Sequence, residues 1–360
     1  MGEWPAVVAV GVSALALSLA LVPLARRWAL QFDVTDRPST AKAHKVATPY
    51  LGGVAVAAAV LIGALIGGWK GEAAAMLGAA LLVAGIGLVD DMKTATPAVR
   101  LVVETAAAVV AFSAGARVEL LGGFGDLALT VVWLVLLTNA YNLLDNMDAC
   151  APLILGTSAA ALLAAAMMND QVLVATLAVA VVGAASGFVV YNWHPARIFL
   201  GDAGSLFLGF LVSAIALKLR FPVSYGTGGI AVALVAAPAL FDTTLVVISR
   251  SLANRSIYLG GTDHTSHRLA ALGLTTRQIA ALLAVVSAGC GVAGVSVGRG
   301  VIGPWIALGP AALLTPVLLA VLLRVPVYAR DAEPDGLAAA LQPVPPSRVR
   351  TIPTLVPDTN

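Results

Sequence analysis

Two adjacent aspartates, Asp90 and Asp91, end the apolar run MLGAALLVAGIGLV. Their carboxylates repel each other and lie at the negative end of a helix dipole, so the pair needs an offsetting partner. Water alone could solvate them; the alternative is that they hold a cation or transfer a proton. The pair is therefore a candidate for acid–base chemistry at the end of a membrane helix.

Another aspartate, Asp202, lies in GDAGS, where a loop enters an apolar run. Aspartate at such a position often only caps a helix. Gly201 and Gly204, however, allow the backbone to approach a ligand closely, and a helix N-terminus presents free amides to anions. A phosphate or metal–phosphate site is the functional alternative.

Amides and carboxylates crowd the end of a further apolar run, at Asn139, Asn142, Asp145, Asn146 and Asp148. The three asparagines follow an i, i+3, i+7 spacing that places them on one helix face. Such a stripe can be a hydrogen-bonding seam between membrane helices. Because carboxylates accompany it, oxygen ligation of Mg²⁺ is the other interpretation.

Histidines and arginines gather in DHTSHR, where His264 and His267 precede Arg268. A zinc site is disfavoured because no matching Cys or His set occurs elsewhere. Histidine with arginine suits a phosphorylated ligand better, since arginine supplies forked donors. Arg255 could join them or only determine topology.

A second basic group, Lys42, His44 and Lys45, precedes TPYLGG. These residues could attract anionic lipid headgroups or receive the phosphate of a lipid substrate. Two carboxylates, Glu104 and Asp242, lie inside apolar runs. Such embedded groups are functional candidates, although hydrogen bonding to a neighbouring helix also explains them.

The candidate residues together match one chemistry, which is metal-assisted transfer involving phosphates. A divalent cation would neutralise a diphosphate, basic side chains would bind phosphate oxygens, and a carboxylate could accept a proton from the nucleophile.

The elements that must position these residues are membrane helices. Hydrophobic residues make up 59% of the chain, charged residues 11%, and the mean hydropathy is +0.94. A crossing helix needs about 20 apolar residues, and no segment alternates as a transmembrane barrel would. We therefore predict an all-α polytopic bundle of about eleven spans, near residues 5–30, 51–68, 73–89, 97–115, 127–144, 151–168, 172–190, 204–219, 228–249, 277–297 and 302–324.

The distribution of positive charge predicts the orientation. When the 21 Lys and Arg residues are assigned to alternate connecting segments, only five fall on the face without motifs: Lys70, Arg117, Lys218, Arg220 and Arg299. By the positive-inside rule the motif-bearing face is cytoplasmic, the N-terminus outside and the C-terminus inside. The first run lacks a basic flank before it and is expected to be a retained helix rather than a signal peptide.

Composition also excludes some functions. A net charge of +2 is too small to indicate nucleic-acid binding. The two cysteines, Cys150 and Cys290, offer no disulfide framework. We predict one membrane domain over residues 1–324 and a disordered, proline-rich cytoplasmic tail over residues 325–360.

In order along the chain, five segments resemble the polyprenyl-phosphate N-acetylhexosamine-1-phosphate transferases, the superfamily of the WecA and MraY types. They are DRPSTAKAHKVATPYLGG, the pair Asp90 and Asp91, NAYNLLDNMD, NWHPARIFLGDAGSLFLG and DHTSHRL. The resemblance implies a reaction at the inner face of the plasma membrane. A UDP-sugar and a polyprenyl phosphate (undecaprenyl or decaprenyl) would give a polyprenyl-diphosphate sugar and UMP, the first lipid-linked step of a cell-envelope glycan.

The resemblance also implies roles for particular residues. Asn142 and Asp202 would bind Mg²⁺, with Mn²⁺ as the alternative ion. Asp90 would activate the lipid phosphate for direct attack, and Asp91 would support that site. Further residues would contact the substrates: Asp145 and Asp148 the nucleotide, His264, His267, Arg268 and Arg255 the sugar nucleotide, and Lys42, His44 and Lys45 the lipid phosphate or diphosphate.

Two departures from the family pattern bear on which sugar the UDP-sugar substrate carries. DNMDA stands where glycines are common in the family, and two histidines stand where the muramoyl-pentapeptide type has three. This favours N-acetylglucosamine, with the muramoyl-pentapeptide enzyme as an alternative. From another class, a secondary transporter would use Glu104 and Asp242 as midplane coupling groups. The expected partners are the UDP-sugar, the lipid phosphate, the membrane and, as an option, a second copy of the chain.

Overall fold

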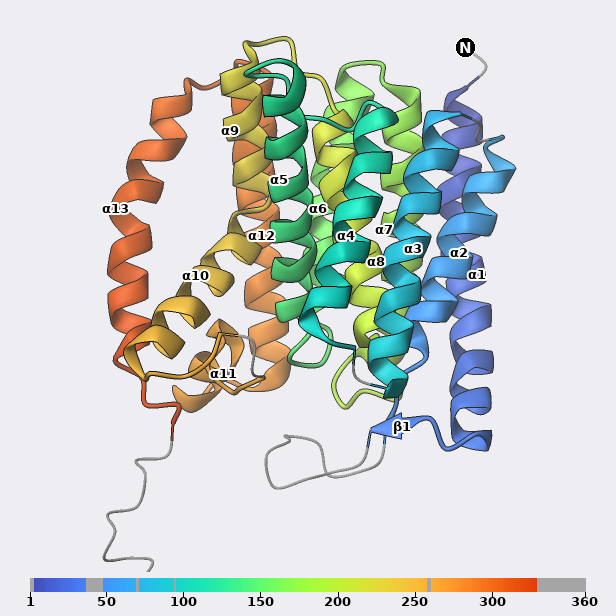
Figure 1. Ribbon diagram of the computed structural model, residues 1–360, viewed down its shortest axis with the longest axis vertical. Helices are drawn as coiled ribbons and strands as arrows, with labels where there is room; N and C mark the ends of the chain where they lie inside the picture. The colour runs from blue at the N-terminus through green and yellow to red at the C-terminus, as the bar shows by residue number, and fades with distance from the viewer. Residues whose placement is uncertain (1–2, 37–47, 69–70, 94, 258–259, 329–360) are drawn as a thin grey trace, which may run out of the picture.

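A computed structural model describes residues 3–36, 48–68, 71–93, 95–257 and 260–328. These residues form thirteen helices: α1 (Trp4–Gln31), α2 (Gly52–Ile66), α3 (Glu72–Lys93), α4 (Pro97–Ser113), α5 (Gly123–Leu143), α6 (Cys150–Met168), α7 (Val172–Asn192), α8 (Gly201–Lys218), α9 (Tyr225–Val235), α10 (Ala237–Leu252), α11 (Thr265–Ala271), α12 (Thr276–Gly298) and α13 (Pro304–Leu323). Most run roughly parallel to one axis, as Figure 1 shows.

The helices confirm a polytopic membrane protein. Eight are long and apolar enough to cross a membrane, or nine if α9 and α10 count as one span. Each of the eleven predicted runs coincides with a helix, although the ninth contains two. Because α2 and α4 have only 15 and 17 residues, the count of eleven crossings stays a prediction.

The ninth run breaks at Ala236, between α9 and α10, which meet at 69°. Pro238 lies in the first turn of α10. Proline lacks an N–H and clashes with the preceding turn of a continuous helix, so it begins a new helix here. Helix α10 consequently runs diagonally from the bundle towards α13 (Figure 1).

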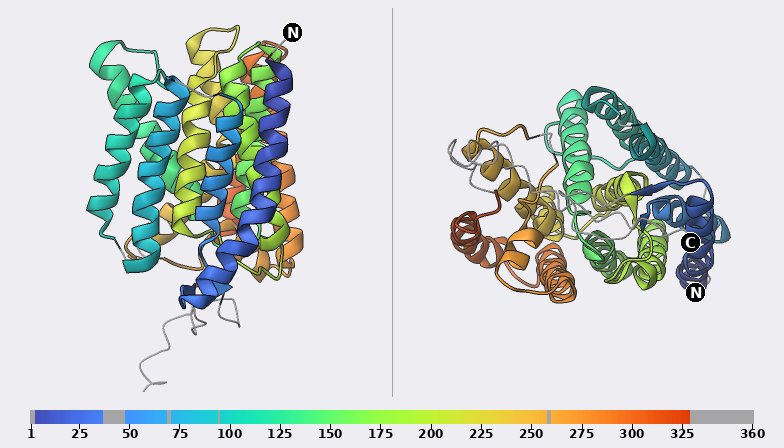
Figure 2. Two further views of the ribbon diagram at one scale, coloured as in Figure 1. Left: turned by 90° about the vertical axis from the view of Figure 1, so that its right-hand side faces the viewer. Right: turned by 90° about the horizontal axis from the view of Figure 1, so that it is seen from below.

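Helix α8 is the most enclosed of the candidate spans, with 83% of its apolar window buried. It packs against α2, α3, α5 and α6, and the view along the bundle in Figure 2 shows it among them. Small residues permit this packing: a Cβ on Gly53 would lie 2.2 Å from the amide nitrogen of Gly204. Close approach of small residues is typical of helix contacts in lipid.

One end of the bundle collects the segments that carry the predicted motifs. Helices α3, α5 and α10 end there, α4 and α8 begin there, and α11 lies there, at the bottom of Figure 1. The antiparallel strands β1 (Thr35–Asp36) and β2 (Thr48–Pro49) are a minor exception to the predicted all-α class. The predicted tail, residues 325–360, is described only as far as Tyr328.

Candidate active site

Asp91 holds helix α8 in place. Its carboxylate oxygens accept hydrogen bonds from the backbone amides of Asp202 (2.8 Å) and Ala203 (3.0 Å), in the first turn of α8. A carboxylate at that position satisfies free amides and favours the helix dipole. Asp202 therefore does not cap its own helix; Asp91 caps it instead.

Gly201 lets this contact form. Its φ is +71°, and a Cβ there would lie 2.8 Å from Oδ2 of Asp91 and 2.8 Å from the carbonyl oxygen of Tyr50. Glycine is the residue that tolerates both the positive φ and the close approach.

Asp90 points to a different partner. Its Oδ1 accepts the backbone amide of Ala95 at 2.7 Å, and its Oδ2 accepts Nη1 of Arg100 at 3.1 Å. Its side chain is 14% exposed, so one carboxylate of the adjacent pair stays accessible while the other is a helix cap. Like charges are thereby turned in different directions, which lowers their repulsion.

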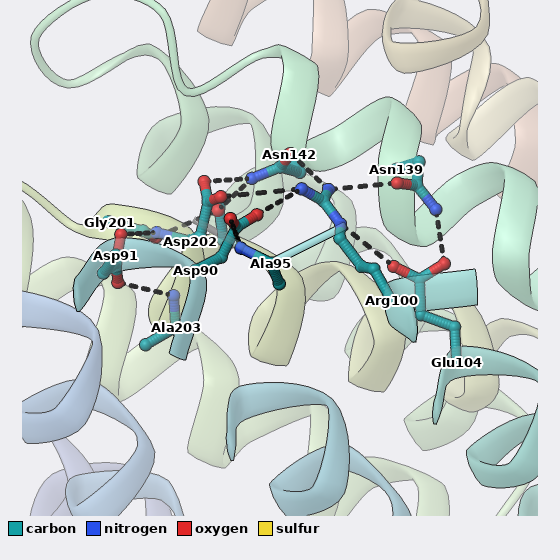
Figure 3. Close-up of polar contacts among 11 residues, drawn as sticks. Asp90, Asp91, Ala95, Arg100, Glu104, Asn139, Asn142, Gly201, Asp202 and Ala203 are labelled. Carbon is teal, nitrogen blue, oxygen red and sulfur yellow. Dashed lines mark hydrogen bonds and ion pairs between the residues drawn. The ribbon is translucent and has the colours of Figure 1, made fainter. Parts of the chain in front are cut away.

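Asn142 and Asp202, the predicted metal ligands, lie side by side. Nδ2 of Asn142 donates to Oδ1 of Asp202 and to Oγ of Ser205, both at 2.8 Å. Oδ1 of Asn142 accepts Nη2 of Arg100 at 2.7 Å, and Oδ2 of Asp202 lies 3.5 Å from Nη1. The structure therefore brings Asp90, Asn142 and Asp202 to one guanidinium, as Figure 3 shows.

Arg100 lies at the centre of the site, with a side chain 17% exposed. Residue type and spacing gave it no role in the site. Its Nε approaches Oε1 of Glu104 at 3.4 Å, and its Nη2 donates to Oδ1 of Asn139 at 3.0 Å. The available signal was an arginine one turn inside an apolar helix, four residues before a carboxylate.

The donor set fits a hard divalent cation. Carboxylate and amide oxygens are the ligands that Mg²⁺ prefers, and Asp90, Asp202 and Asn142 offer these oxygens to a single point, where they contact a cationic group. Among the described residues no three His, Cys, Asp or Glu side chains are arranged to hold a metal ion. Metal binding at Asn142 and Asp202 would thus use one amide and one carboxylate, beside the guanidinium of Arg100.

Asp145 adds a further carboxyl group to the same region. It follows the end of α5, and burial together with the charges of Asp202, Asp91 and Asp148 raises its pKa to about 8. Such a carboxyl group keeps its proton unless a cation or a basic group compensates its charge.

Asp148 shapes the neighbouring loop. Its Oδ2 lies 2.7 Å from Nδ1 of His194 and accepts the backbone amide of Ala196 at 3.0 Å. Nε of Arg277 donates to the carbonyl oxygen of His194 at 3.0 Å. The loops before α6 and α8 and the first turn of α12 are therefore joined at this end of the bundle.

The histidine segment joins the same end through two contacts. Nδ1 of His264 lies 2.9 Å from Oδ2 of Asp242, whose Oδ1 accepts the amide of Thr265 at 2.7 Å. The hydroxyl of Ser266 donates to the side chain of Asn146. Helix α11 is thereby anchored both to α10 and to the loop after α5.

The buried Nδ1 atom of His267 has no hydrogen-bond partner in the part of the chain that the structure describes. Its ring centroid lies 5.7 Å from that of His264. Burial and the nearby His264 lower the pKa of His267 to about 4, so it is neutral at physiological pH. A neutral ring with an unpaired nitrogen can accept or donate a hydrogen bond to a ligand.

Arg268 is enclosed by acceptor groups of the protein. It is 1% exposed, and its guanidinium donates to the carbonyl oxygens of Asp263 (3.0 Å), Leu322 (2.7 Å) and Val325 (2.9 Å), and to Ser249. Burial lowers its pKa. These contacts join α11 to the end of α13, and binding of the sugar nucleotide by Arg268 stays a prediction.

Arg255 stays accessible at the edge of this region. Its guanidinium lies 4.2 Å from the ring centroid of Tyr328, in a cation–π contact. The hydroxyl of Tyr328 donates a hydrogen bond to the carboxylate of Asp263. The guanidinium of Arg250 donates two more to that carboxylate, at 2.8 and 2.9 Å. Although burial opposes it, these hydrogen bonds and the Arg250 charge bring the pKa of Asp263 down to about 2.

Lys42, His44 and Lys45 lie outside the described residues. The strands that flank them, β1 and β2, pair with each other. The carbonyl oxygen of Pro49, in β2, accepts the amide of Phe199 at 2.7 Å, two residues before α8 begins. Both ends of that segment are therefore near the start of α8.

The embedded carboxylates Glu104 and Asp242 both bind groups at the site end of the bundle. Glu104 is 0% exposed and contacts Arg100 and Asn139, while Asp242 is 1% exposed and contacts His264 and Thr265. Each is paired with a residue of the site, which differs from the midplane coupling pair that the transporter hypothesis requires.

The arrangement is a cluster of carboxylates around one guanidinium, near a histidine segment whose His267 Nδ1 has no partner among the described residues. Carboxylates and a cationic donor at one point can bind a phosphate, through the guanidinium or through a cation held by the carboxylates, and can accept a proton.

Comparisons with known proteins agree with this chemistry. Residues 73–220, from α3 to the loop after α8, match the model of glycosyl transferase family 4. A Bacillus subtilis protein described as a probable undecaprenyl-phosphate N-acetylglucosaminyl 1-phosphate transferase is 32% identical over 72% of the chain and 76% of its own length.

Two other relatives cover different shares of the chain. The decaprenyl-phosphate N-acetylglucosaminephosphotransferase of Mycolicibacterium smegmatis is 29% identical over 76% of this chain and 78% of its own length. The phospho-N-acetylmuramoyl-pentapeptide-transferase of Bacillus velezensis is 33% identical, but over 58% of this chain and 72% of its own. The match to the N-acetylglucosamine type thus extends over more of this sequence.

Proposed function

The chain belongs to glycosyl transferase family 4, and we propose that it transfers N-acetylglucosamine 1-phosphate from UDP-N-acetylglucosamine to a polyprenyl phosphate. The products are a polyprenyl-diphosphate sugar and UMP. One observation supports this most directly: Asp90, Arg100, Asn142 and Asp202 come from four helices and converge at one end of a membrane bundle. A lipid phosphate can reach that point from the bilayer and a nucleotide from water.

The chemistry follows from those groups. An oxygen of the lipid phosphate attacks the phosphorus that bears the sugar, and the bond from this phosphorus to the bridging oxygen breaks, so UMP leaves. Asp90 accepts any proton that remains on the attacking phosphate. Arg100 donates hydrogen bonds to phosphate oxygens, where charge accumulates during the transfer. Direct attack requires no covalent bond to the protein.

Asn142 and Asp202 would hold Mg²⁺, or Mn²⁺ in its place. When bound, the ion neutralises diphosphate charge and stabilises the leaving UMP. Asp91 keeps the first turn of α8 in register, so that Asp202 faces Asn142. Asp148 would shape the nucleotide-binding part of the site through its contacts with His194 and Ala196. His267 supplies an unpaired ring nitrogen to the sugar nucleotide.

The site is proposed to face the cytoplasm at the plasma membrane. Charge asymmetry supports this, since most Lys and Arg lie in the segments at the site end. UDP-sugars do not cross a bilayer, so sealed inverted vesicles should form product while intact spheroplasts should not.

The test is UMP release by purified protein. UDP-N-acetylglucosamine should yield UMP only when polyprenyl phosphate and Mg²⁺ are both present, and Asp202→Asn should nearly abolish turnover while thermal unfolding is unchanged. If no sugar in a panel of UDP-sugars yields UMP, the proposed function is wrong. Preference for the UDP-muramoyl-pentapeptide in that panel would instead favour the muramoyl alternative.

A further inference from the structure

Glu104 is a carboxylate without access to water or substrate. It lies on α4 with a side chain 0% exposed. Its Oε1 accepts Nε of Arg100 (3.4 Å), and its Oε2 accepts Nδ2 of Asn139 (2.5 Å). Because Oδ1 of Asn139 accepts Nη2 of the same arginine at 3.0 Å, the three side chains close a ring, which Figure 3 shows beside the candidate active site.

A buried carboxylate in a membrane helix is costly, so it persists only where its partners compensate it. Helix stability does not explain the pair, since an arginine four residues before a glutamate is the less favourable order for such contacts. The ring instead holds Nε and Nη2 of Arg100 against Glu104 and Asn139. The remaining donors then point at Asp90, Asp202 and Asn142.

We propose that Glu104 and Asn139 are positioning residues that set the orientation of Arg100 for its contact with the phosphates. Neither touches the substrate. This inference rests on the proposed function, because it concerns how one donor of that reaction is held. A guanidinium on a long side chain has many rotamers, and fixing it in advance lowers the barrier of a reaction in which phosphate charge shifts.

The hydrogen-bond pattern of the ring allows a swap test. Glu104→Gln replaces an acceptor with an amide donor facing the donor of Asn139, so Arg100 loses its fixed orientation. Adding Asn139→Asp restores a complementary pattern: the glutamine oxygen accepts Nε, its amide donates to the new carboxylate, and that carboxylate accepts Nη2. The negative charge has then moved from position 104 on α4 to position 139 on α5, while the ring of hydrogen bonds is kept.

The measurement is UMP release, with kcat and KM determined separately and thermal unfolding recorded for each variant. Glu104→Gln alone should lower kcat about 10- to 100-fold with a smaller change in KM, and the double variant should regain most of that loss. In an Arg100→Ala background, Glu104→Gln should cause no further loss of kcat. Thr105→Ala, an exposed neighbour on the same helix turn, is the matched control.

Each outcome is decisive. If wild-type protein releases no UMP, the proposed function fails, and this inference fails with it. If the wild type is active and Glu104→Gln has the same kcat as the wild type, only the inference about Glu104 is overturned. The inference is also overturned if the double variant folds but regains none of the lost kcat. It is overturned as well if the losses of kcat from Arg100→Ala and Glu104→Gln are additive, because a purely structural role predicts both results.

Discussion

At the scale of single residues, the site is organised by the imbalance between acidic and basic groups. Asp90, Asp202 and Glu104 surround Arg100, and Asp145 lies close enough to Asp202 and Asp91 for their charges to raise its pKa. One guanidinium cannot offset all of these carboxylates if each is ionised. Among the described residues no second cationic side chain contacts these carboxylates, so a metal ion or retained protons would offset the remaining charge.

Asp145 gives this imbalance a measurable pH dependence. Burial and the neighbouring carboxylates raise its pKa from 3.8 to about 8. Between these values the folded protein retains a proton that the unfolded chain has released, so the stability of the metal-free protein falls as pH rises through this window. The side chain of Asp145→Asn cannot ionise, so the stability of this variant should decrease less as the pH rises.

The measurement is the midpoint of thermal unfolding of wild type and Asp145→Asn, in detergent with a chelator, at pH 5 and pH 8. At pH 8 the unfolding midpoint of the variant should lie higher relative to that of the wild type than it does at pH 5. Added Mg²⁺ should reduce this difference, because a cation favours the ionised carboxylate of the wild type. Parallel pH profiles for the two proteins would show that Asp145 ionises normally.

At the scale of elements, the site depends on how closely α3 approaches α8. Asp91 reaches the amides of α8 only because Gly87, one turn earlier on α3, has no side chain. A Cβ at Gly87 would lie 2.5 Å from the carbonyl oxygen of Asp202. The contact is with backbone, which cannot rotate away, so the two helices would have to separate.

A pair of glycines on α3 provides the matched experiment. Gly87→Ala should destabilise the protein by about 1–3 kcal/mol, because overpacking forces backbone shifts, and should lower turnover. Gly85→Ala, two residues away, meets nothing within 4 Å and should change stability by less than about 1 kcal/mol. Thermal unfolding and UMP release measure both; equal behaviour of the two variants would contradict the role of the α3–α8 contact.

At the scale of the whole molecule, the histidine segment is held by elements far apart in the sequence. Asp242 on α10 binds His264, Asn146 after α5 binds Ser266, and Arg268 binds the carbonyl oxygens of Leu322 and Val325 at the end of α13. Helix α13 itself packs loosely, with 6% of its apolar window buried. Arg268 is consequently a main attachment between α13 and the site end of the bundle.

Arg268→Gln tests this attachment. The substitution leaves buried carbonyl oxygens without donors, each costing about 1–3 kcal/mol, so the thermal unfolding midpoint should fall by several degrees. Arg255→Gln, at an exposed arginine of the same region, should leave the midpoint unchanged. A wild-type midpoint for Arg268→Gln together with a raised KM for the UDP-sugar would instead support the predicted role of Arg268 in binding the sugar nucleotide.

The sequence by itself determined the membrane character, the approximate helix positions and the family. Apolar runs of spanning length report the thickness of the hydrocarbon layer directly, and local motifs such as GDAGS or DHTSHRL are contiguous in the chain. The break between α9 and α10 was not predicted, although Pro238 marks it, because the whole run was apolar enough for one span.

Only the tertiary structure decided which polar residues share a partner. It separated Asp90 from its neighbour Asp91, which caps α8, and it brought Arg100 to Asp202 across 102 positions of sequence while burying Arg268 against α13. These distinctions depend on the packing of helices against one another. Residue type and spacing within one segment do not specify that packing, because the same arginine can face lipid headgroups, a carboxylate or a carbonyl oxygen according to which helix lies beside it.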